Sequence, residues 1–244
     1  LIGMRLARCS ESVFQPSTRD TFVRNTSPNT NYGSETSIHL YDHTSDRRRI
    51  LLEFDISDIP INTTFFQSDL QLYYYANDKN NPSGKTTWAY KLTRTNWVES
   101  QATWNIYKTD SNWTTAGGDY VTSNPSGGSA NIPASFGWVT WGINEIIQDA
   151  SDTANNVEVF IKYENEELWE AIGSGVSLFY SREYMNDIFL RPKLTVVYVT
   201  LPQDFFQIAL SSFLRPYGEQ LEKSSFSLSA NLEPNRWKKD TTHS

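Results

Sequence analysis

The stretch that most constrains the fold is residues 49–57, Arg-Ile-Leu-Leu-Glu-Phe-Asp-Ile-Ser, in which an apolar residue stands at every second position. Ile50, Leu52, Phe54 and Ile56 lie on one side of an extended chain, and the residues between them lie on the other. Because successive side chains of a β-strand point to opposite faces, this period of two predicts a strand with one face in a hydrophobic core.

Shorter runs with the same period recur along the chain, and turn-forming residues separate them. These runs are residues 20–24, 38–43, 68–76, 86–94, 137–141, 156–163, 178–180 and 194–199. One segment departs from the period, because Ile143, Ile146, Ile147 and Ala150 recur at helical spacing and predict one short helix. Aromatic residues make up 14% of the chain, which favours half-buried sheet surfaces. We therefore predict an all-β fold, a two-sheet β-sandwich with one short helix.

The two ends of the chain lack this pattern. Residues 1–17 have no period and are interpreted as a non-globular N-terminal arm, which precedes the sandwich at residues 18–200. Residues 201–244 are interpreted as a C-terminal tail, because beyond a weak helical stripe they are too polar to build a core. The candidate interface residues of this tail are Phe206, Leu210, Phe213 and Trp237. We expect the tail to dock on a partner subunit, within a larger assembly.

Composition excludes several classes of partner. The formal net charge of −7 repels phosphate backbones, so we expect no nucleic-acid partner. The single cysteine, Cys9, excludes an internal disulfide bond and a cysteine metal cluster. No apolar run is long enough to span a bilayer, and residues 1–8 are too short and too charged for a signal peptide.

Six motifs follow one another between about residues 18 and 200. They are Asp20-Thr-Phe-Val-Arg, Asn31-Tyr-Gly-Ser, residues 49–60, residues 97–104 (Trp-Val-Glu-Ser-Gln-Ala-Thr-Trp), Phe179-Tyr-Ser-Arg-Glu and Leu190-Arg-Pro-Lys-Leu-Thr-Val. In these motifs the chain resembles the DNRLRE domain family, which is related to the family-96 carbohydrate-binding modules and to disaggregatase-type surface proteins. The resemblance implies a jelly-roll β-sandwich without catalytic residues, found as an accessory or adhesive module in extracellular enzymes, cell-surface proteins and phage structural proteins. It places the protein outside a cell, on a cell surface or on a virus particle.

Outward aromatic side chains are the first candidates for ligand contact. Sugars present apolar C–H faces and hydroxyl rims, so flat aromatic rings with polar neighbours suit them. The candidate glycan-binding residues are Tyr41, Tyr73, Tyr75, His39, Arg24 and Lys91, of which the last two supply charge for an acidic sugar. The alternative interpretation is that outward tyrosines pair across strands and stabilise the sheet.

A structural calcium ion is a second candidate ligand, since oxygen-rich loops on sandwiches bind such ions. Its candidate ligands are Asp20, Asp42 and Asp46, which lie near predicted loop ends, although their spacing matches no standard ion-binding loop. No other cofactor is expected.

The sequence contains no recognisable catalytic constellation, so we predict that the protein is not an enzyme. The chain has three histidines and lacks a nucleophile elbow, a phosphate-binding glycine loop and His/Cys metal spacing. The run of three arginines at residues 47–49 is interpreted as no concentrated patch, because neighbouring strand residues face opposite sides. Structural roles are expected for Trp97, Trp104, Trp113, Trp138 and Trp141.

Two functions remain open at this point. The first is a non-catalytic module, displayed outside a cell or on a virion, that binds glycans for adhesion or surface decoration. The second is a purely structural subunit of a virus particle, filament or cell-surface assembly with no small ligand.

Overall fold

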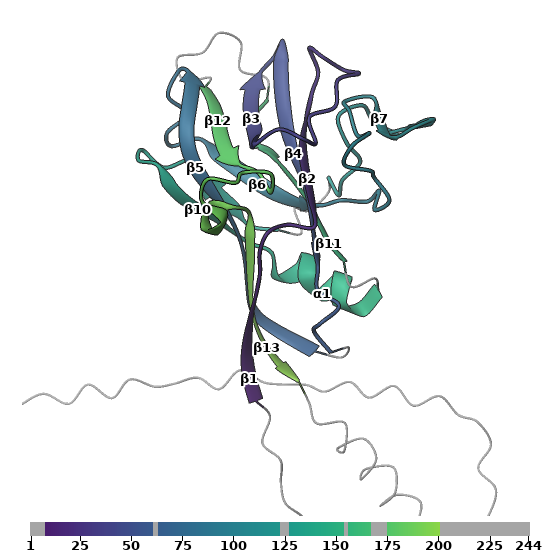
Figure 1. Ribbon diagram of the computed structural model, residues 1–244, viewed down its shortest axis with the longest axis vertical. Helices are drawn as coiled ribbons and strands as arrows, with labels where there is room; N and C mark the ends of the chain where they lie inside the picture. The colour runs from purple at the N-terminus through teal and green to yellow at the C-terminus, as the bar shows by residue number, and fades with distance from the viewer. Residues whose placement is uncertain (1–7, 61–62, 123–126, 154–155, 167–174, 201–244) are drawn as a thin grey trace, which may run out of the picture. The chain divides into compact units, whose positions relative to one another are not determined.

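The computed structural model describes residues 8–60, 63–122, 127–153, 156–166 and 175–200 (Figure 1). Its strands are β1 (Arg8–Phe14), β2 (Arg19–Arg24), β3 (Ser37–His43), β4 (Asp46–Asp55), β5 (Thr63–Lys79), β6 (Thr86–Lys91), β7 (Ile106–Lys108), β8 (Ser111–Asn112), β9 (Ser129–Asn131), β10 (Gly137–Gly142), β11 (Asn156–Tyr163), β12 (Gly175–Tyr180) and β13 (Lys193–Thr200). The helical elements are α1 (Asn144–Thr153) and the single 3-10 turn η1 (Ile188–Leu190). The predicted all-β class with one short α-helix is confirmed.

Eleven of the strands form one curled antiparallel sheet, and its order is β1-β13-β5-β12-β3-β4-β11-β6-β9. In addition, β10 pairs with β5 and β2 pairs with β4. The hairpin between β3 and β4 joins two halves, with Tyr41 opposite Arg48 and His43 opposite Asp46. The part that contains β5 and β12 is called the β5 half below, and the part that contains β4, β11 and β6 is called the β4 half. Strands β7 and β8 form a separate two-stranded ribbon.

The apolar sides of the two halves share the main core. Leu72 of β5, Phe179 of β12, Leu52 of β4 and Val159 of β11 are fully buried in one cluster. Helix α1 adds its apolar stripe to the same cluster, as the helical spacing predicted. The predicted β-sandwich is therefore confirmed, with the two layers continuous through the β3–β4 hairpin.

The other face of the β4 half is buried as well. Leu51 of β4 and Phe160 of β11 pack in a second cluster with Trp97 and Trp113. Both tryptophans belong to residues 92–122, which are called the cover segment below. Since Leu51 and Leu52 are both fully buried, β4 is covered on both of its faces.

Residues 8–14, which the sequence analysis placed in a non-globular arm, form β1. This strand pairs with β13 from Arg8 opposite Thr200 to Phe14 opposite Leu194. That part of the arm prediction is wrong. The more buried face of β1 carries Ser10 and Ser12 in place of apolar residues, so no apolar period marks the strand. Ser12 Oγ lies 3.2 Å from the Tyr198 hydroxyl. Residues 1–7, and the predicted tail with its interface candidates, lie outside the described residues.

Candidate functional site

A cleft of about 650 Å³ opens between the β4 half and the cover segment. Strand β4 contributes two arginines two residues apart, which therefore share a face, and the cover segment contributes most of the rest. The charged and aromatic donors that line it are Arg47, Arg49, Arg94, Trp104 and Tyr120. Threonine hydroxyls and the carboxylate of Asp119 complete the polar lining.

Arg49 anchors the wall of the cleft. Its Nε and Nη2 donate to the two carboxylate oxygens of Glu166 at 2.9 and 2.7 Å, and its Nη1 donates to the carbonyl of Gly117 at 3.1 Å. The guanidinium carbon lies 4.8 Å from the centre of the Trp104 ring. Gly117 has a φ of +91°, and a Cβ there would meet both Arg49 and Trp104 at 2.7 Å. Only glycine suits this position, so the arginine and the indole are held in fixed places.

Arg47 and Arg94 are less constrained and half-buried. Arg47 Nε donates to the backbone carbonyl of Glu166 at 3.2 Å, and among the described residues the two Nη nitrogens of its guanidinium make no hydrogen bond. Arg94 Nε lies 3.7 Å from a carboxylate oxygen of Asp119. A guanidinium carries five N–H donors, so both arginines retain donors toward the cleft. With three arginines and one acid in its lining, the cleft favours an anionic ligand.

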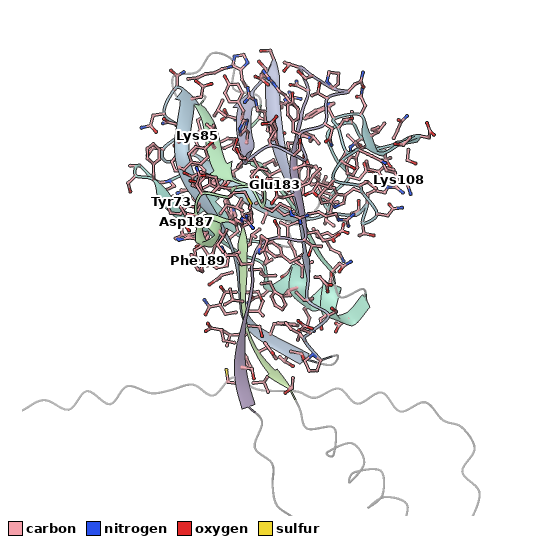
Figure 2. All side chains as sticks on the ribbon, viewed as in Figure 1. Tyr73, Lys85, Lys108, Glu183, Asp187 and Phe189 are labelled. Carbon is pink, nitrogen blue, oxygen red and sulfur yellow. The ribbon has the colours of Figure 1, made fainter. Side chains whose placement is uncertain are left out.

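The outer face of the β5 half carries a second group of aromatic side chains, the tyrosine row: Tyr73 and Tyr75 of β5, Tyr180 of β12, and Tyr184. Tyr180 stacks on Tyr75 with ring centres 4.1 Å apart and on Tyr184 with centres 3.6 Å apart. Tyr73 lies at the edge of the molecule in Figure 2, and the edge of Trp138 meets its ring at 5.4 Å. A hydrogen bond with Tyr184 raises the pKa of Tyr180 to about 12. Since the rings stack on one another, they offer edges and hydroxyl groups to solvent more than free faces.

The tyrosine row contains two of the residues expected to bind glycan, Tyr73 and Tyr75. They share an outward face as predicted, but their contacts are those of cross-strand pairs.

Three other candidate glycan residues gather around Asp46. Arg24 Nε and Nη2 donate to the two carboxylate oxygens of Asp46, each at 2.8 Å. Tyr41 is only 3% exposed, and the ring of His39 stacks on Phe22 with centres 4.3 Å apart. Burial, together with the nearby arginines, lowers the pKa of His39 to about 4. This group is therefore an internal network at the β3–β4 hairpin.

Lys91 lies apart from both groups, with its Nζ 2.9 Å from Oδ2 of Asp149 on α1. The six residues expected to bind glycan thus occupy three places and do not form one platform.

The three expected metal ligands do not come together either. Asp42 forms an ion pair with Lys85. Burial alone would raise the pKa of Asp46, but hydrogen bonds from Arg24 and Arg48 outweigh it and lower the pKa to about 2. Each of these carboxylates therefore has a cationic partner, and neither belongs to a cluster of three acidic groups in the described ranges.

Asp20 instead lies beside Glu99 and Glu183, which the sequence analysis did not select. One carboxylate oxygen from each of the three residues lies within 4.8 Å of the other two, and this is the one such acidic group in the described ranges. Two features of the sequence could have identified the cleft arginines and the group of three acids. Residues 47 and 49 share a strand face, and the acids at 20, 99 and 183 each stand inside one of the six motifs.

The five tryptophans predicted to have structural roles differ in burial. Trp97, Trp113 and Trp141 are buried, whereas Trp104 and Trp138 are half-buried, one in the cleft and one beside the tyrosine row. Trp113 Nε1 donates to the carbonyl of Thr103 at 2.9 Å, which ties the cover segment to itself.

The comparison with known protein families gives one match. A family model described as carbohydrate-binding module family 96 matches residues 11–198. No curated protein matches the chain. In the described ranges, no helix has the length and apolarity that crossing a bilayer requires.

Proposed function

The chain belongs to carbohydrate-binding module family 96, and we propose that it binds an anionic polysaccharide in the cleft between β4 and the cover segment. The proposed role is recognition without catalysis, because the family is one of binding modules. We also propose that it acts outside a cell or on a virus particle, in adhesion or surface decoration, where long polysaccharides are accessible to a protein surface.

The observation that carries this proposal is the combination of fixed rings and incompletely used arginines in one cleft. Trp104 and Tyr120 supply planar apolar surface on the ring faces that Arg49 and Phe160 do not cover, while Arg47 and Arg94 supply charged donors. Sugar rings pack on planar apolar surface, and carboxylate or sulfate groups on a polysaccharide accept hydrogen bonds from charged donors. The volume of about 650 Å³ is within the usual range for ligand sites in proteins.

The test is a titration of the full chain with soluble polysaccharides, matched in length, that carry carboxylate groups, sulfate groups or no charge. We expect saturable binding of an anionic member and weaker binding of the neutral one. Arg47→Gln and Arg94→Gln should each weaken binding by about tenfold or more, since a hydrogen bond to a charged group contributes about 1.5–3 kcal/mol.

Lys108→Gln is the matched control, because it removes one positive charge from the cover segment at a residue that does not line the cleft. An equal loss in all three variants would indicate attraction to overall charge and would contradict a site in the cleft.

The tyrosine row is the competing surface, and Tyr75→Ala tests it. If Tyr75→Ala abolishes binding while Arg47→Gln and Arg94→Gln leave it intact, the cleft assignment is wrong and the exposed sheet face is the binding surface. Melting temperatures of all variants should be measured alongside, so that loss of fold is not read as loss of binding.

A further inference from the structure

Three carboxylates from widely separated segments converge at one end of β2. Asp20 is the second residue of β2, and Glu99 belongs to the cover segment. Glu183, labelled in Figure 2, follows β12 in the connection to β13. One oxygen of each lies within 4.8 Å of the others. Like charges this close repel each other, so the fold needs a compensating positive charge at this place.

Neighbouring groups hold these carboxylates in position but leave one oxygen of Asp20 and one of Glu183 without a partner. Asp20 Oδ2 accepts hydrogen bonds from Ser17 Oγ at 2.6 Å and from the backbone N–H of Arg182 at 2.9 Å. Glu99 Oε1 accepts from the backbone N–H of Asp20 at 2.7 Å, and Glu99 Oε2 lies 3.2 Å from Arg182 Nη1. Glu183 Oε1 lies 3.6 Å from Arg182 Nε, and the Glu183 backbone N–H donates to the hydroxyl of Ser181 at 3.2 Å.

The loop around Glu99 is fixed by the segment that precedes β3. Asn31 Nδ2 donates to the carbonyls of Glu99 and Ala102 at 2.6 and 2.8 Å. The backbone of Gly33 approaches Glu99 so closely that an added Cβ would overlap it. The carboxylate of Glu99 is therefore presented by a rigid support.

Two buried oxygens of the cluster have no partner. Asp20 is 1% exposed, and its Oδ1 accepts no hydrogen bond, while Oε2 of the half-buried Glu183 accepts none either. A buried carboxylate oxygen without a partner costs free energy, and each such atom in a folded protein needs an explanation. An ion bound between these oxygens would supply the missing partner of both.

The charge balance also favours a divalent cation. Three carboxylates and the guanidinium of Arg182 leave two negative charges, since nearby Arg19 is already paired with Glu53. Without a further cation, the cluster therefore keeps a net negative charge in a largely buried place.

We propose that Asp20, Glu99 and Glu183 bind a calcium ion. Calcium takes six to eight oxygen ligands at about 2.3–2.6 Å, so oxygens on opposite sides of the ion lie up to about 5 Å apart. The spacing within the cluster matches that geometry, and water would complete the coordination. The ion would tie β2, the cover segment and the connection after β12 to one another, which assigns it a structural role distinct from glycan contact in the cleft.

The experiment uses the full chain, freed of metal with a chelator and titrated with calcium chloride by isothermal titration calorimetry. We expect one ion per chain with a micromolar to millimolar dissociation constant, and a higher melting temperature with calcium than with chelator. Glu183→Gln should weaken binding at least tenfold. Glu11→Gln, which neutralises an exposed acid on β1, should bind calcium as the unmodified chain does.

A chain that shows neither heat nor a change in melting temperature at millimolar calcium would overturn the proposal. The proposal would also be wrong if Glu183→Gln bound calcium like the unmodified chain. Should Glu183→Gln fail to fold, terbium luminescence on the unmodified chain, excited through its aromatic residues, gives the answer. Terbium emission that calcium displaces at one site supports the proposal, and its absence contradicts it.

Discussion

The two outer faces of the sandwich differ in how far the rest of the chain covers them. On the β4 half, the cover segment lies over Leu51 and Phe160 and creates a second core with a cleft at its border. On the β5 half, the tyrosine row stays at the surface, and its rings cover one another. The difference indicates that an outward aromatic residue becomes part of a core or of a surface according to what the rest of the chain lays over it.

The largest expected effect comes from replacing one tryptophan on each face. Trp113→Ala should lower the free energy of unfolding by about 3–5 kcal/mol, because it leaves a cavity under the cover segment and an unpaired carbonyl on Thr103. Trp138→Ala should cost only about 1–2 kcal/mol, because its half-buried ring makes one T-shaped contact with Tyr73 and carries the Lys193 ammonium 4.3 Å from its centre. Urea denaturation measures both, and similar losses would mean that the two faces are equally buried.

The next test separates the covered face from its cleft. Arg49→Met should lower the free energy of unfolding by about 3 kcal/mol, since it leaves the buried carboxylate of Glu166 without its main partner. Adding Glu166→Gln removes the unpaired charge and should restore part of the stability. A double-mutant cycle gives the coupling between them, and a coupling near zero would show that the pair does not anchor the cleft.

Low pH should destabilise the β3–β4 hairpin, where the two halves join. The pKa of His39 is about 4 in the folded protein and about 6.5 in an unfolded chain, so the unfolded state takes up a proton first as pH falls. Stability from this residue is complete above about pH 6.5 and is lost as pH falls to about 4.

The contribution of His39 to the free energy of unfolding should fall by about 2 kcal/mol over this pH range, after allowance for its partial exposure. Arg48 and Arg24 lower the pKa of His39, whereas Asp78 and Asp46 oppose them. Denaturation curves at pH 7 and pH 4.5 should therefore differ less in His39→Gln than in the unmodified chain, and equal differences would exclude His39 as the cause.

The smallest expected effect concerns the exposed face. Tyr75→Ala removes one stacked ring from the tyrosine row and should lower the free energy of unfolding by about 1 kcal/mol. Phe189→Ala, which truncates a side chain that is 74% exposed, should change it by less than about 0.5 kcal/mol. A loss above about 3 kcal/mol for Tyr75→Ala would show that this row is a core in its own right.

Local patterns in the sequence were enough to predict the strands that alternate and the helix. The alternation at residues 49–57 identified β4 and its inward side correctly, because side-chain direction in a strand depends only on neighbouring residues. The burial of Leu51 and Glu53 on the other side could not be predicted, since it depends on a segment some 50 residues later in the chain. β1 was missed because its partner, β13, lies at the opposite end of the domain.

The sites were harder to predict than the fold for the same physical reason. Asp20 and Glu99 stand 79 positions apart, so no spacing rule brings them together. The cleft arginines were discounted by comparing adjacent residues, whereas positions 47 and 49 are the pair that shares a face. The links to the DNRLRE and disaggregatase families remain predictions from the motifs.

The pairing of β1 with β13 has a mechanical consequence. Arg8 lies opposite Thr200, so the chain enters and leaves the domain at neighbouring points (Figure 1). A force that pulled these two ends apart would load the hydrogen bonds of this ribbon one at a time, beginning at its open end. Under tension the pairing of β1 with β13 would therefore open from this end, at a lower force than strands sheared along their length.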